Sequence, residues 1–140
     1  MLEIDAIAVP DLADPLFAPF WQGTRHGELR IQYCAASDRL YWPPRIRCHI
    51  SGSTDMSWVA VAAKGTVYSY VVVGKSMIKG FEAPYTIALV TLDGHPHIRV
   101  AGVLGDGGTA AIGAAVEGVF RPAGPAGEFV LLNWRPVAGV

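Results

Sequence analysis

The fold is decided by residues 29–61, LRIQYCAASDRLYWPPRIRCHISGSTDMSWVAV. Two short segments in this stretch, residues 34–37 (CAAS) and 48–51 (CHIS), have the spacing of the paired C-x2-C knuckles that hold structural zinc. A hairpin-like middle, Leu40–Pro44, separates them. This outline predicts a zinc ribbon in which each knuckle keeps its first cysteine and has a serine where the second would stand.

The two serines predict that this ribbon has lost its metal. A structural zinc site needs four thiolate or imidazole ligands, and a serine hydroxyl does not ionise near neutral pH. We therefore predict no metal at the four degenerate positions, Cys34, Ser37, Cys48 and Ser51. Structural zinc supplies roughly 10–16 kcal/mol to small zinc domains, so the apolar and proline side chains of the segment must stabilise it instead.

Two alternatives for the cysteines stay open at this level. Cys34 and Cys48 could form a residual metal site together with His49 or Asp38. They could also form a disulfide, which is disfavoured if the chain works in the reducing cytoplasm.

The composition limits the class of protein. The 140 residues fit one compact domain, or a domain with a small appendage. A hydrophobic content of 51%, a charged content of 16% and a mean hydropathy of +0.33 indicate apolar surface reserved for a partner chain or for self-association. The net charge of −1 excludes a general polyanion-binding surface. No basic and apolar leader and no membrane-length apolar run are visible, so we expect a cytoplasmic protein without membrane contact.

Residues 1–28 are expected to form an N-terminal arm with one short helix. Asp14-Pro15 is a helix-start signal, but Pro19 restricts the regular helix to about Pro19–His26. The aromatic side chains of this element have two interpretations. They cap the chain's own core, or they dock on another subunit; the residues concerned are Phe17, Phe20 and Trp21.

Residues 62–140 predict a small β-barrel. Segments rich in β-branched and aromatic residues recur between turn signals, at residues 65–73, 84–92, 97–104, 116–120 and 129–134. Five strands without a long helix are typical of a closed OB-type barrel. The fold class expected is therefore mainly β: a short N-terminal helix, a degenerate zinc ribbon over residues 29–61, and a five-stranded OB-fold barrel.

The order of short motifs along the chain resembles the DUF35 family. The matching pieces are Phe20-Trp21, Gly27–Leu29, Cys34, Arg39-Leu40, Pro43–Arg45, Cys48, Gly52–Asp55, Trp58-Val59, Gly65–Ser69, Pro84-Tyr85, Leu89-Val90, Leu92-Asp93 and Ile112-Gly113. Members of this family pair a rubredoxin-like zinc ribbon with an OB-fold. Ser37 and Ser51 depart from the family pattern, which has cysteine there.

This resemblance implies a non-catalytic accessory subunit of an acyl-CoA-processing complex, with a thiolase-like, acyltransferase, hydratase or aldolase partner. It implies a hetero-oligomer, a CoA thioester as the ligand and no other cofactor. We find no nucleophile–base arrangement and predict no catalytic residue. The basic residues that would contact the CoA phosphates are Arg45, Arg47, Lys75 and Lys79, although an ordinary solvated surface is the simpler explanation for them.

Three further interpretations were weighed. His95 and His97 are a weak candidate for a metal site, since turn histidines are usually only solvated. Aromatic residues of the barrel could stack on single-stranded nucleic acid, but the near-neutral charge argues against that ligand; they are Tyr68, Tyr70, Phe81 and Tyr85. The last alternative is a stand-alone acyl-CoA-binding protein.

Overall fold

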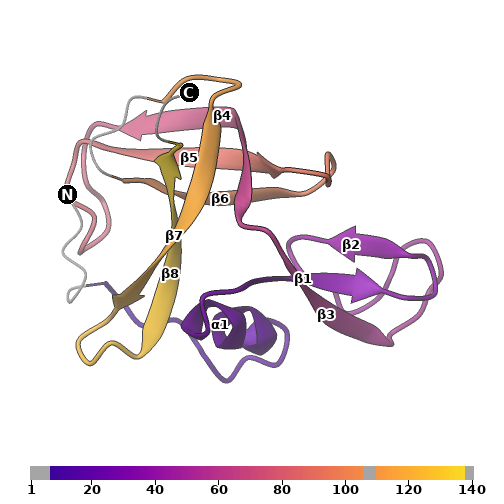
Figure 1. Cartoon of the computed structure of the whole chain (residues 1–140). Helices are drawn as coiled ribbons and strands as arrows, with labels where there is room; N and C mark the ends of the chain where they lie inside the picture. Colours follow the sequence, from indigo (N-terminus) through magenta and orange to yellow (C-terminus); the bar gives the residue numbers. More distant parts are fainter. Residues whose placement is uncertain (1–6, 106–109, 138–140) are drawn as a thin grey trace.

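A ribbon and a closed barrel lie side by side and are bridged by one helix in the computed structural model, which describes residues 7–105 and 110–137 (Figure 1). The elements are α1 (Ala18–Arg25), β1 (Leu29–Cys34), β2 (Arg39–Tyr41), β3 (Met56–Val61), β4 (Lys64–Val73), β5 (Tyr85–Leu92), β6 (Arg99–Leu104), β7 (Ala115–Ala123) and β8 (Phe129–Pro136). This arrangement confirms the predicted mainly β fold. No helix of the described residues is long and apolar enough to cross a bilayer.

The barrel closes in the order β4-β5-β6-β8-β7. Residues 64–66 at the start of β4 pair with residues 115–117 of β7, while β6 meets β8 in parallel at Leu104 and Trp134. Side chains that point inward alternate with exposed ones, as expected for a strand with one face on a core. Trp134 is fully buried at the centre, among Val67, Val90 and Val100.

The ribbon is a three-stranded antiparallel sheet in the order β2-β1-β3. The predicted hairpin position is wrong in detail: Leu40 and Tyr41 lie in strand β2, and the bend comes earlier, at residues 35–38. Asp38 closes this bend with a positive φ of 49°, a conformation that Asp tolerates better than most residues. The prolines stiffen the segment after β2, where the Trp42–Pro43 bond is cis.

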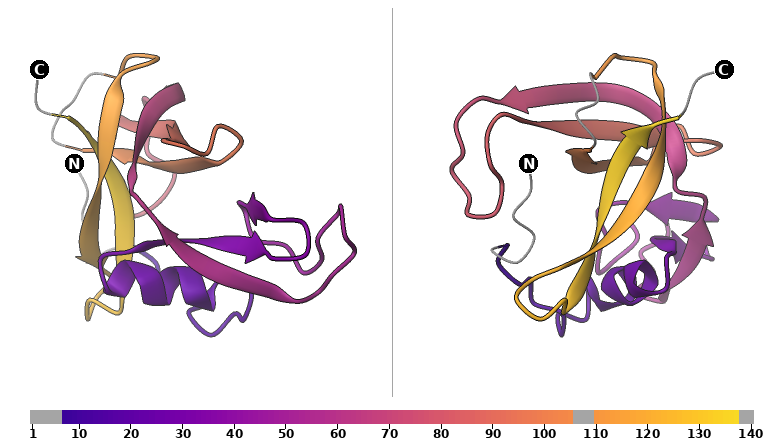
Figure 2. Two further views of the ribbon diagram at one scale, coloured as in Figure 1. Left: turned by 45° about the vertical axis from the view of Figure 1, so that its right-hand side comes forward. Right: turned by 60° about the vertical axis from the view of Figure 1, so that its left-hand side comes forward.

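Helix α1 lies against both halves of the molecule (Figure 2). Its Phe20 ring packs on Trp42 of the ribbon at 4.8 Å between centroids, and its Trp21 ring packs edge-on against Phe129 of the barrel at 5.5 Å. Because Phe20 is buried and Trp21 half-buried, these aromatics belong to the chain's own core. The structure thus favours the core interpretation of this helix over the docking one.

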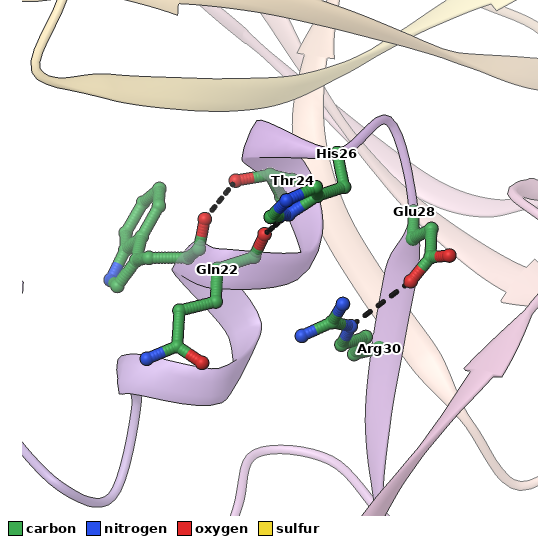
Figure 3. A network of polar contacts seen from close by, with 6 residues as sticks. Gln22, Thr24, His26, Glu28 and Arg30 are labelled. Carbon is green, nitrogen blue, oxygen red and sulfur yellow. Dashed lines mark hydrogen bonds and ion pairs between the residues drawn. The ribbon is translucent and has the colours of Figure 1, made fainter.

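The end of α1 fixes the path of the chain into β1 (Figure 3). The Thr24 hydroxyl donates to the Trp21 carbonyl at 3.1 Å, and the His26 Nδ1–H donates to the Gln22 carbonyl at 2.7 Å. The second of these bonds satisfies a carbonyl group that the last turn of the helix leaves without a backbone partner. Gly27 then takes the left-handed conformation that ends many helices, with φ 70°.

Candidate functional site

The structure brings the four degenerate knuckle positions into contact with one another. The Cys34 sulfur lies 3.5 Å from the Ser51 hydroxyl, and the Cys48 sulfur lies 3.3 Å from the Ser37 hydroxyl. Cys34 and Cys48 form no disulfide, and both side chains are fully buried. We call this group, together with Tyr41, the knuckle cluster.

Cys48 is the centre of the knuckle cluster. Its sulfur also lies 2.9 Å from the Tyr41 hydroxyl, and it accepts a hydrogen bond from the Ser51 backbone N–H at 3.4 Å. Burial by itself raises the pKa of the thiol, but the hydrogen bonds from Ser37, Ser51 and Tyr41 outweigh burial and lower the pKa to about 5. A pKa lowered in this way favours the thiolate form of Cys48 at neutral pH. Burial and the bond to Cys48 raise the pKa of Tyr41, so its hydroxyl stays a donor.

Gln32 of β1 holds the start of the loop that carries Cys48; from here on this loop, residues 45–53, is called the second knuckle. Its side-chain amide donates to the Arg45 carbonyl at 2.8 Å, and its carbonyl oxygen accepts from the Arg45 N–H at 2.7 Å. Gln32 is buried and reaches across 13 residues of sequence. This reciprocal pair satisfies both backbone groups of Arg45 in the way that a neighbouring strand would.

The side chains proposed to complete a residual metal site point to other partners. The His49 Nδ1 atom contacts the Tyr41 hydroxyl at 3.1 Å and the Arg45 guanidinium at 3.3 Å. Asp38 accepts a hydrogen bond from the Tyr33 hydroxyl at 2.6 Å. Within residues 7–105 and 110–137, no three His, Cys, Asp or Glu side chains lie together as metal ligands would. Two cysteine sulfurs and two neutral hydroxyls therefore do not fit the donor set of a structural zinc site.

The ionised state of Cys48 makes the stability of the fold depend on pH. The folded pKa of about 5 lies below the unfolded value of 9.0, so the unfolded chain binds more protons between these pH values. The stabilisation is complete above pH 9 and is lost as the pH falls towards 5. We expect the melting temperature to rise steadily from pH 5 to pH 9, measured by circular dichroism in buffers of equal ionic strength.

Variants of the two buried cysteines provide the control for this pH dependence. Cys48→Ala should flatten the rise, because it removes the titrating thiol, whereas Cys34→Ala should keep it. Equal slopes for the wild type and Cys48→Ala would contradict the assignment of the thiolate.

The four residues expected to contact CoA phosphates lie in two separate places. Arg45 and Arg47 belong to the second knuckle, where Arg45 stacks over the Tyr41 ring at 5.1 Å and Arg47 donates to the Gly52 carbonyl. Lys75 and Lys79 are exposed on the β4–β5 connection, which lies at the opposite end of the molecule from the ribbon (Figures 1 and 2). One phosphate cannot contact all four side chains, and each pair stays a prediction by itself.

A shallow cleft separates the ribbon sheet from the β5–β6 turn. Its volume is about 470 Å³, and its lining is Tyr33, Asp38, Leu40, Val59, Ala60, Val61, His95 and His97. The apolar part comes from β2 and β3, and the two imidazoles come from the barrel. The sequence singled out these histidines, but it gave no indication that they would face the ribbon, because that contact depends on how the two halves pack.

The outer half of the β4–β5 hairpin exposes an apolar surface. Consecutive residues of β4 are exposed on both faces of the strand, and the connection continues the surface; its members are Tyr68, Tyr70, Val71, Val72, Met77 and Ile78. Arg99 covers one face of Tyr68 at 3.9 Å from the ring centroid. The low charge of the chain predicted apolar surface of this kind without predicting its position.

Comparison with known protein families matches both halves of the chain. Residues 21–57 match the model described as "ChsH2, rubredoxin-like zinc ribbon domain", and residues 58–121 match "ChsH2, C-terminal OB-fold domain". The two matches meet next to the start of β3 and together cover most of the chain.

Two curated relatives are similar in sequence. The "3-oxo-4,17-pregnadiene-20-carboxyl-CoA hydratase alpha subunit" of Mycobacterium tuberculosis is 33% identical over 125 residues, which are 81% of this chain and 39% of that protein. The "Probable enoyl-CoA hydratase alpha subunit" of Thermomonospora curvata is 42% identical over 74 residues, which are 52% of this chain and 23% of that protein. The chain thus spans well under half the length of these curated relatives.

Two solved structures share the architecture. A chain of the "Ltp2-ChsH2(DUF35) aldolase" superposes with a TM-score of 0.81 at 32% identity, covering 91% of this chain and 98% of that one. A DUF35 protein of unknown function from Sulfolobus solfataricus, at 16% identity and a TM-score of 0.62 over 89% of this chain and 87% of its own, shares the fold. The ribbon, the barrel and the near-complete match to the aldolase-associated chain together establish that this chain belongs to the DUF35 family, in its ChsH2-like form.

Proposed function

We propose that this chain is a non-catalytic accessory subunit of an acyl-CoA-processing enzyme complex, with a hydratase or aldolase subunit as its partner. The observation that supports this most strongly is the match to the Ltp2-ChsH2(DUF35) aldolase, whose matched chain is covered over 98% of its length. Both curated relatives are named as alpha subunits of CoA hydratases, so the same unit occurs there within a longer chain.

The chemistry of the described residues supports the non-catalytic part of the proposal. Catalysis by a cysteine requires a thiolate that a substrate can reach. The lowered pKa of Cys48 favours its thiolate form at neutral pH, but its side chain is fully buried and its sulfur is surrounded by Ser37, Tyr41 and Ser51. Its environment therefore suits a structural role.

The surface supports a role in a complex. Large apolar side chains on the outer half of the β4–β5 hairpin are 42% to 81% exposed. Exposed apolar surface of this kind is typical of subunits that meet another protein. A hetero-oligomer, a thiolase-like or acyltransferase partner, contact with a CoA thioester and a cytoplasmic location remain finer parts of this proposal.

Co-expression tests the proposal. The tagged chain is produced together with the hydratase, aldolase or thiolase-like enzyme encoded nearest to it in its own genome. We expect the two to elute as one complex, and we expect the activity of the enzyme, or its yield as a folded protein, to fall at least about tenfold when this chain is omitted. The isolated chain should not turn over the thioester. An enzyme that folds and works equally well alone, or turnover by the isolated chain, would contradict the proposal.

A further inference from the structure

The second knuckle, residues 45–53, is fastened to the ribbon at several points, none of which requires a metal. Gln32 clasps the Arg45 backbone, the Cys48 sulfur contacts Ser37 and Tyr41, and the Arg47 side chain donates to the Gly52 carbonyl. The backbone adds a bond from the Cys48 N–H to the Ser53 carbonyl at 2.9 Å. These contacts tie both ends of the knuckle loop to β1 and β2 or to the loop itself.

We infer that the ribbon of this chain folds without zinc, and that hydrogen bonds from Ser37, Tyr41 and Ser51 to the two buried sulfurs do the work of the missing cation. A zinc ion brings two positive charges to the four thiolates of such a site and cross-links them. With serine at two of the four positions, two negative charges are gone. The Cys48 sulfur instead lies within hydrogen-bond distance of the Ser37 and Tyr41 hydroxyls and the Ser51 N–H, and such contacts stabilise a sulfur that carries negative charge.

The positions of the two serines support this inference. Each serine stands at the second ligand position of its knuckle, where a zinc ribbon has cysteine. The Ser37 hydroxyl contacts the Cys48 sulfur, and the Ser51 hydroxyl contacts the Cys34 sulfur, so each serine reaches the cysteine of the other knuckle. The hydroxyls therefore join the two knuckles across the cluster, as a shared zinc would. An apolar replacement at either position would leave a buried sulfur without this donor.

The same geometry predicts that the site can be restored. In a tetrahedral site with Zn–S bonds of about 2.3 Å, neighbouring sulfurs lie about 3.8 Å apart. The Ser–Cys contacts of 3.3 and 3.5 Å place the side chains of the four positions close to that separation. Thiols at positions 37 and 51 would complete a four-cysteine set on an existing scaffold.

The experiment compares the wild type with the double variant Ser37→Cys/Ser51→Cys by thermal unfolding, each with equimolar zinc and with excess chelator. The wild-type melting temperature should be the same in both, whereas chelation should lower that of the double variant by at least about 10 °C. A chelator-sensitive wild type would overturn the inference, and so would a double variant that folds but gains nothing from zinc.

A single substitution tests the hydrogen bonds even if the double variant does not fold. Ser37→Ala should lower the melting temperature by several degrees and move the pH midpoint of the thiolate ultraviolet absorbance upward. Ser69→Ala, on an exposed part of β4, is the matched control and should change neither. If Ser37→Ala behaves like this control, the Ser37 hydroxyl does not stabilise the ribbon and the inference fails. Neither readout depends on an enzyme partner, so this inference and the proposed function can fail separately.

Discussion

Replacing Gly65 with alanine is expected to destabilise the barrel strongly. A Cβ atom at this position would lie 2.1 Å from the carbonyl oxygen of Thr91 and 2.8 Å from Cγ1 of Val90. Gly65 pairs with Leu92 on β5 and with Val116 on β7, so it lies at the seam where the barrel closes. Since the nearest atom belongs to the backbone of a paired strand, the clash can be relieved only by parting the strands. We expect a loss of about 3 kcal/mol or more in unfolding free energy, measured by urea titration.

Gly74→Ala is the matched control for this substitution. Gly74 follows β4, and a Cβ there would meet nothing within 4 Å. Its effect should stay within about 0.5 kcal/mol, as for most exposed substitutions. Similar effects of the two substitutions would contradict the close strand approach at Gly65.

Gln32→Leu is expected to loosen the second knuckle while the barrel stays folded. The substitution replaces the amide with an apolar side chain of similar size and removes both bonds to the Arg45 backbone. Each partly buried backbone group left without a partner costs about 1–3 kcal/mol, so the loss should be about 2–4 kcal/mol. Hydrogen exchange followed by mass spectrometry should show faster exchange in residues 45–53 and little change in the barrel strands.

Gln22→Leu makes the same chemical change in a different environment. The Gln22 side chain is exposed on α1, and only its backbone carbonyl takes part in the polar contacts drawn there (Figure 3). This variant should leave exchange in the second knuckle unchanged. If the amides of residues 45–53 exchange in Gln32→Leu as slowly as in the wild type, the two bonds from Gln32 to the Arg45 backbone are not needed to hold the second knuckle.

The sequence was sufficient to predict the ribbon and the barrel because both depend on local patterns. The spacing of Cys34, Ser37, Cys48 and Ser51 predicted two facing knuckles, and the β-branched runs predicted the five strands. The way the barrel closes could not be predicted, because pairing of β4 with β7 joins residues about 50 positions apart, such as Gly65 and Val116.

The side-chain contacts between the two knuckles could not be predicted from the sequence either. That Tyr41 and Ser37 both donate to Cys48, and that Gln32 clasps Arg45, depends on rotamers and loop paths which no spacing specifies. The four residues expected to contact the CoA phosphates lie as two pairs at opposite ends of the molecule, which their positions along the sequence did not indicate. A count of charges along a chain carries no information on such distances.

Native mass spectrometry of the wild-type chain, after incubation with excess zinc and buffer exchange, tests the central claim most directly. The ribbon described here holds its shape through Cys48, Ser37, Tyr41 and Ser51, so the account predicts the mass of the polypeptide alone, in a folded low-charge distribution. A folded species heavier by one zinc atom, lost together with the fold on chelation, would contradict it.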